Sequence, residues 1–111
     1  MSHINGRFYF KLTDAGNLIG EYSNYATLSS LPESALRKSE SPQDGFVGDY
    51  VSTWFEPSAP NCVAADLHIV RKSQSRGLFT LTWSGILGCN DRYEGEAMLC
   101  DGILIGDYRS V

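Results

Sequence analysis

The sequence predicts an all-β protein: an antiparallel up-and-down meander of seven or eight strands that forms a small barrel or half-open barrel. Three observations lead to this prediction. Apolar and polar residues alternate along most of the chain, and turn residues, among them some of the 11 glycines, separate the alternating runs. An apolar–apolar–Gly–acid–Tyr pattern also occurs at 18–22, 46–50 and 104–108. Glycines within strands permit the bending that a closed sheet requires.

The first elements form a hairpin. In residues 7–12, Phe8, Phe10 and Leu12 share one face, and 18–23 returns after a turn at 14–17. The stretch from 24 to 45 breaks this rhythm. Within it, 25–30 is a candidate short strand and the 31–38 region is expected to be one short helix. Pro32 suits a first helical turn, and Arg37 and Lys38 suit the negative end of a helix dipole.

Alternation resumes at residue 45 and continues to the end of the chain. Strands are predicted at 45–56, 63–72, 77–84, 92–100 and 103–110. The last two are joined by Asp101–Gly102, a pair that favours the tight turn of a two-residue hairpin. We expect one barrel domain over residues 1–111.

The first hairpin resembles a known family. Residues 8–12, with the sequence FYFKL, and 16–23, with the sequence GNLIGEYS, are similar to the opening hairpin of avidin-like proteins. More broadly, the chain resembles the calycin group of lipocalins, avidins and fatty-acid-binding proteins, which implies a meander barrel that holds a ligand. The chain lacks the lipocalin Gly-x-Trp opening. Trp54 and Trp83 do not fall where biotin-binding motifs would place them, so biotin is not implied.

Composition excludes several functions. The net charge is −4 and no basic cluster is present that would neutralise phosphates, so nucleic acid is not an expected partner. No apolar run approaches the roughly 18 residues of a membrane helix, and the N-terminus lacks the features of a signal peptide. We therefore expect a cytoplasmic protein without membrane contact. The three cysteines show no metal-binding spacing, so we expect neither a metal nor another cofactor.

The predicted inner face is rich in aromatic residues, and strand glycines lie beside them. Such rings would suit a flat, partly polar ligand if the glycines leave room for one. The alternative is that the rings themselves fill that room. The candidate ligand contacts are Tyr22, Tyr50, Trp54, Trp83, Tyr93 and Tyr108.

The acidic residues of the strands fall on the opposite face. Alternation places Glu21, Asp49, Glu94, Glu96 and Asp107 outside, where Arg7, Lys11, Arg92 and Arg109 are available as partners. No nucleophile elbow, phosphate loop or catalytic triad is present, so no catalytic residue is assigned.

These observations favour a small-molecule-binding barrel for an apolar or aromatic ligand. The first alternative is an interaction module with a filled core that forms a homodimer through outer apolar residues. Those residues are Ile19, Val47, Val51, Phe55 and Ile105. The second alternative is a small barrel enzyme that uses a tyrosine with an acid such as Glu94 or Glu96, which requires a carboxylate that points inward.

Overall fold

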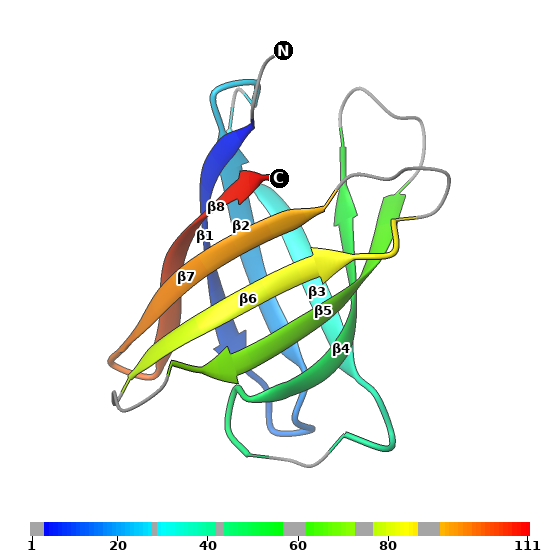
Figure 1. The fold of residues 1–111 in the computed structure, drawn as a ribbon, viewed down its shortest axis with the longest axis vertical. Coiled ribbons are helices and arrows are strands. Elements are labelled where there is room, and N and C mark those ends of the chain that lie inside the picture. The colour runs from blue at the N-terminus through cyan, green and yellow to red at the C-terminus, as the bar shows by residue number, and fades with distance from the viewer. Residues whose placement is uncertain (1–3, 28, 42–43, 57–61, 73–76, 87–91) are drawn as a thin grey trace.

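The chain forms a closed barrel of eight antiparallel strands, in which each strand pairs with the next and β8 pairs with β1 (Figure 1). The computed structural model describes residues 4–27, 29–41, 44–56, 62–72, 77–86 and 92–111. The predicted all-β meander is therefore confirmed. None of the described segments contains a helix suited to crossing a membrane. The strands are β1 (Asn5–Leu12), β2 (Leu18–Asn24), β3 (Leu31–Arg37), β4 (Gly48–Phe55), β5 (Cys62–Arg71), β6 (Leu78–Ser84), β7 (Tyr93–Cys100) and β8 (Ile103–Ser110).

The short helix expected in the 31–38 region is wrong, because this segment is strand β3. Its residues alternate like those of the other strands, with Glu33 and Ala35 buried and their neighbours exposed or partly exposed. Pro32 is tolerated because the ladder to β4 begins only at Glu33, so no β4 bond needs a Pro32 N–H. The eighth strand is thus β3. The candidate short strand at 25–30 is wrong, because residues 25–26 form a turn and residue 27 is irregular.

Two of the strand glycines allow neighbouring backbones to approach closely. A side chain at Gly20 would collide with the backbone oxygen of Tyr9 on β1. At Gly106, a Cβ would collide with the backbone oxygen of Glu96 on β7. These glycines are therefore required by strand packing in the closed sheet, and they do not open an interior void.

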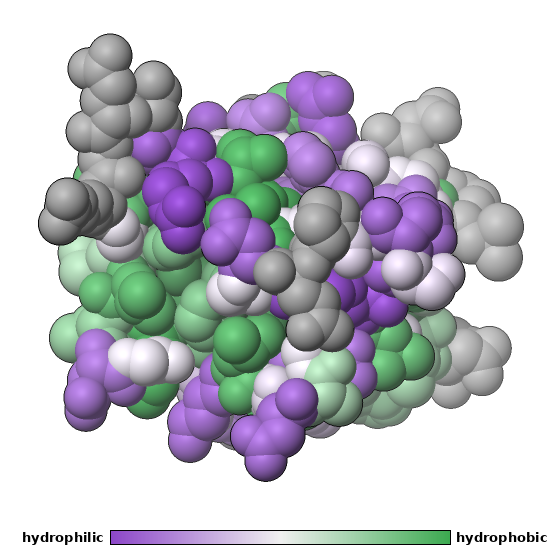
Figure 2. Space-filling model, turned by 90° about the horizontal axis from the view of Figure 1, so that it is seen from below, coloured by the Kyte–Doolittle hydropathy of each residue, from purple (hydrophilic) through white to green (hydrophobic). Residues whose placement is uncertain are grey.

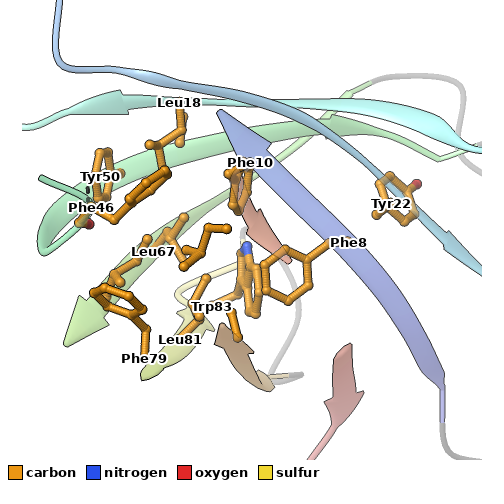
Figure 3. Close-up of a cluster of buried hydrophobic side chains, with 14 of the residues drawn as sticks. Phe8, Phe10, Leu18, Tyr22, Phe46, Tyr50, Leu67, Phe79, Leu81 and Trp83 are labelled. Carbon is orange, nitrogen blue, oxygen red and sulfur yellow. Dashed lines mark hydrogen bonds between the residues drawn. The ribbon is translucent and has the colours of Figure 1, made fainter. Parts of the chain in front are cut away.

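Apolar side chains fill the lower part of the barrel in the orientation of Figure 1. Phe10, Leu18, Ile69, Leu81 and Leu104 are completely buried. Figure 3 shows this cluster, with Phe46 and Tyr50 together at one end and Tyr22 apart at the other. The Tyr50 hydroxyl donates a hydrogen bond of 2.8 Å to the backbone oxygen of Phe46.

Arg37 closes the lower end. Its guanidinium donates hydrogen bonds to the backbone oxygens of Gly16, Gly45 and Val47, at 2.8, 2.6 and 2.9 Å respectively. It also lies 4.7 Å from the centre of the Tyr50 ring. Figure 2 looks onto this end and shows polar and apolar side chains gathered across it. A ligand-binding space is therefore to be sought at the opposite, upper end, where β1 begins and β8 ends (Figure 1).

Candidate functional site

Five aromatic rings meet at the upper end of the barrel. We call these residues, Tyr22, Trp54, Trp83, Tyr93 and Tyr108, the upper aromatic cluster. The Tyr108 ring is central, with its centre 6.4 Å from that of Tyr22, 6.2 Å from that of Trp83 and 5.8 Å from that of Tyr93. The Trp54 ring centre lies 6.4 Å from that of Tyr93. The structure thus brings together five of the six residues that the sequence suggested as ligand contacts.

Tyr50 is the sixth, and it lies outside this cluster. It is completely buried among the core residues of the lower end, beside Phe46, and its ring contacts the Arg37 guanidinium. Its position follows from the start of its strand: Tyr50 is the third residue of β4, whereas Tyr22 is the fifth of β2 and Tyr108 the sixth of β8. The repeated Gly–acid–Tyr pattern therefore places its tyrosines at different heights in the barrel.

Polar groups of the cluster are held by protein partners. The Tyr22 hydroxyl donates to the backbone oxygen of Phe55, and the Tyr108 hydroxyl accepts a 2.9 Å hydrogen bond from the Asn24 amide. The Trp54 indole N–H donates to Oε1 of Glu56 at 3.0 Å. These bonds fix the rings in place before any ligand arrives, which reduces the ordering cost of binding.

The space beside Gly95, the glycine next to this cluster, is also filled. A Cβ at Gly95 would lie 2.6 Å from the backbone oxygen of Asp107, 3.2 Å from the Trp83 ring and 3.3 Å from the Phe8 ring. At this position the β8 backbone and the two rings take the room that glycine leaves, as the filled-core alternative expects. An interior ligand must therefore bind among the rings at the upper end rather than over the glycines.

A buried carboxyl group lies beside the upper aromatic cluster. Glu33 is 6% exposed, and its Oε2 atom accepts hydrogen bonds from the Ser52 hydroxyl at 2.6 Å and from the Trp83 indole N–H at 2.9 Å. Burial raises the pKa of Glu33 to about 7, although both hydrogen bonds act in the opposite direction. Glu33 therefore exchanges a proton near neutral pH.

The second oxygen of this carboxyl group is open. No residue that the structure describes donates a hydrogen bond to Oε1 of Glu33. Among the described residues, every fully enclosed side-chain nitrogen or oxygen has a partner. Oε1 is therefore not fully enclosed, and a water molecule can contact it.

Electrostatic effects connect Glu33 with the tyrosines of the cluster. Burial raises the pKa of Tyr22, and the carboxylates of Glu56 and Glu33 raise it further. Burial also raises the pKa of Tyr108, with the same two carboxylates adding to the effect. These hydroxyls consequently remain protonated at neutral pH and contribute no negative charge of their own.

The sequence interpretation missed Glu33 because it assigned residues 31–38 to a helix. The available signal was the alternation of Leu31, Glu33, Ala35 and Arg37, which places the glutamate in the same phase as two apolar residues. A charged residue in the buried phase of a strand is uncommon unless it is paired or functional.

The five acids expected outside do lie on the outer surface. The outward placement of Glu94 and Glu96 separates them from the interior tyrosines, so neither is the inward carboxylate that the enzyme alternative requires. Their partners agree in part with expectation: Glu94 pairs with Arg92 and Arg109, at 3.7 and 3.4 Å. The remaining partners are Lys72 for Glu96, His68 for Asp49, and the Tyr9 and Ser30 hydroxyls for Glu21.

The outer surface also carries the expected apolar residues, with one exception. Ile19, Val51, Phe55 and Ile105 are exposed, whereas Val47 packs against the core. A shallow open depression lies over β1, β2 and β8. Its lining includes Arg7, Tyr9, Lys11, Glu21, Ile103 and Ile105.

Metal binding finds no support in the described part of the chain. No group of three or more His, Cys, Asp or Glu side chains lies close enough together there to hold an ion. Cys62 and Cys100 are exposed free thiols, and Cys89 lies outside the described residues.

Comparison with protein-family models, with curated proteins and with solved structures gives no match to this chain. The barrel, the upper aromatic cluster and Glu33 are therefore the features from which a function can be inferred.

Proposed function

We propose that this protein is a calycin-like barrel that binds a small, flat apolar or aromatic molecule at its upper end. The observation that carries the proposal is Oε1 of Glu33, an acceptor without a protein donor among the described residues, on a buried carboxyl group beside the upper aromatic cluster. Buried polar groups in proteins are normally hydrogen-bonded, and an open one beside aromatic side chains is typical of a ligand site.

Arg37 supports this location because it seals the other end of the barrel. A ligand at the upper end would replace water at Glu33 and cover the partly exposed rings of Tyr93 and Tyr108. Apolar contact with the rings would supply most of the affinity, and Glu33 would orient the ligand.

The test uses the two tryptophans of the chain, both of which lie in the upper aromatic cluster. A library of small aromatic compounds is titrated against the protein, and tryptophan fluorescence is followed. A binder should change the emission with a saturable dependence on concentration. The Tyr93→Ala variant should weaken that binder about tenfold, because it removes a partly exposed ring from the site.

The matched control is Tyr9→Ala, which removes a tyrosine from the outer face of β1. This variant should bind the compound as the unmodified protein does. The proposal would be overturned if no compound gave a saturable change. It would also be overturned if Tyr9→Ala weakened binding while Tyr93→Ala did not.

A homodimer is the second candidate, and a specific observation favours it. Leu78, Met98 and Ile105 are neighbours across β6, β7 and β8, and their exposed fractions are 39%, 56% and 46%. A second copy of the chain would cover this apolar row. Light scattering coupled to size-exclusion chromatography tests the idea: a dimer that Met98→Glu converts to a monomer supports it, and a monomer at all concentrations refutes it.

A further inference from the structure

We infer that the ligand is an organic cation, a flat apolar body with a protonated amine that pairs with Glu33 while the aromatic rings contact the remainder. This inference rests on the proposed function, since it names the chemical class bound at the same site. Three features of the upper end support it: the open oxygen of Glu33, the charge around it and the rings.

The open oxygen can accept a hydrogen bond from a ligand donor that takes the place of water. An ionised carboxylate can only accept hydrogen bonds, and Oε2 of Glu33 already has two donors. A protonated amine at Oε1 would form a charge-assisted hydrogen bond, which is roughly twice as strong as a neutral one. The same contact would offset the desolvation of the buried carboxylate.

The two carboxylates that act on Tyr22 and Tyr108 are negatively charged when ionised. Glu33 lies inside, and Glu56 follows β4 and accepts from the Trp54 indole. Both carboxylates influence Tyr22 and Tyr108. Within the described part of the chain, neither glutamate forms an ion pair with a lysine or arginine. An anionic ligand would be repelled here, whereas a cation would meet uncompensated negative charge.

The rings favour the same class of ligand. A cation within about 6 Å of the centre of a tryptophan or tyrosine ring is attracted by the negative face of the ring. Trp54, Trp83, Tyr93 and Tyr108 form a continuous series of ring contacts here, and Trp83 itself donates to Glu33. Because Trp83 presents its N–H edge to Glu33, the ring face that attracts the cation would belong to another member of the series.

The groups that face Glu33 determine how binding depends on pH. The titratable groups coupled to Glu33 are Tyr22 from β2 and Tyr108 from β8, and Glu56 at the end of β4 acts on the same two tyrosines. The inward residues of β4 and β6 beside it, Ser52 and Trp83, do not titrate in this range. Binding of an amine, which stays protonated below about pH 9, should therefore ionise Glu33 and release its proton.

The experiment is isothermal titration calorimetry with four probes of similar size: 2-phenylethylamine, its N,N,N-trimethylammonium analogue, 2-phenylethanol and 3-phenylpropanoate. The primary amine should bind about tenfold or more tightly than the alcohol, and the carboxylate should not bind. The trimethylammonium analogue should fall between amine and alcohol, since it carries the charge without an N–H donor. Titrations of the amine at pH 7 in buffers of different ionisation enthalpy should show release of about half a proton per ligand.

Glu33→Gln provides the matched variant, because the glutamine oxygen can still accept from Ser52 and Trp83. In this variant the amine should bind no more tightly than the alcohol, and no proton should be released. If the variant does not fold, proton release by the unmodified protein decides the question.

Equal binding of amine and alcohol would overturn the inference and leave the proposed function intact. Retention of the amine preference by Glu33→Gln would also overturn it, since the cation would then be recognised elsewhere. Absence of binding by all four probes would overturn it as well, while the fluorescence screen would still decide the proposed function.

Discussion

Glu33→Gln should remove a specific pH dependence from the stability of this protein. The folded protein raises the pKa of Glu33 from 4.5 to about 7, because burial opposes ionisation. The folded state thus binds the Glu33 proton more tightly than the unfolded state does. The stabilising contribution of the Glu33 proton is fully present below about pH 4.5, declines as pH rises and is lost above about pH 7.

The size of this effect follows from the pKa difference. One pKa unit corresponds to about 1.4 kcal/mol, so the unmodified protein should lose about 3 kcal/mol of this contribution between pH 4.5 and 8. Glutamine does not titrate. The free energy of unfolding of Glu33→Gln, measured relative to the unmodified protein, should therefore rise by about 3 kcal/mol over the same range.

Urea unfolding followed by tryptophan fluorescence at half-unit pH intervals measures this difference. Exposed groups titrate similarly in both proteins and cancel in the comparison. The control is Glu21→Gln on the neighbouring strand: the Tyr9 and Ser30 hydroxyls lower the pKa of Glu21, so its stabilisation should be lost as pH falls. A stability difference for Glu33→Gln that is the same at pH 4.5 and pH 8 would refute the assigned burial of Glu33.

Three further substitutions test the barrel itself. Gly20→Ala should destabilise the fold by about 3 kcal/mol in urea unfolding, because the new Cβ meets the Tyr9 backbone; a loss under 1 kcal/mol would contradict the close strand approach. Arg37→Met should lower the free energy of unfolding by about 2 kcal/mol in the same assay, because it removes the hydrogen bonds at the lower end. It should leave ligand affinity unchanged. A loss of affinity would contradict the separation of the two ends. Tyr50→Phe should lower the free energy of unfolding by about 1 to 2 kcal/mol, because a buried hydrogen bond is lost. It should also leave ligand affinity unchanged. A clear loss of affinity would indicate that Tyr50 contacts the ligand.

The alternation of residues was sufficient to predict the meander and the face of most side chains. It succeeded because strand period is a local property, and Phe8, Phe10, Phe79 and Leu81 are buried as expected. It failed for residues 31–37, where Pro32 and a following charge pattern resemble a helix start and end. Pairing with β2 and β4 overrode that local preference.

The sequence pattern does not predict how far along the barrel axis each residue lies. Alternation places Tyr22, Tyr50 and Tyr108 inside, but strand starts and register decide which end each one reaches. Tyr50 reaches the lower end, near Arg37, for this reason, and the other two reach the upper end. Glu33 was missed together with its strand, so the polar part of the candidate site depended on knowing the fold.

The chemistry of position 33 is consistent with the proposed role in binding. Glutamine there would accept the same two hydrogen bonds from Ser52 and Trp83 without the desolvation that raises the pKa of the glutamate. Glutamate offers one property that glutamine lacks, a negative charge near neutral pH. That charge is unfavourable in the isolated barrel, because no lysine or arginine among the described residues pairs with it. It becomes favourable only when a cation enters the site, so the carboxylate has a physical rationale in the ligand complex that it lacks in the free protein.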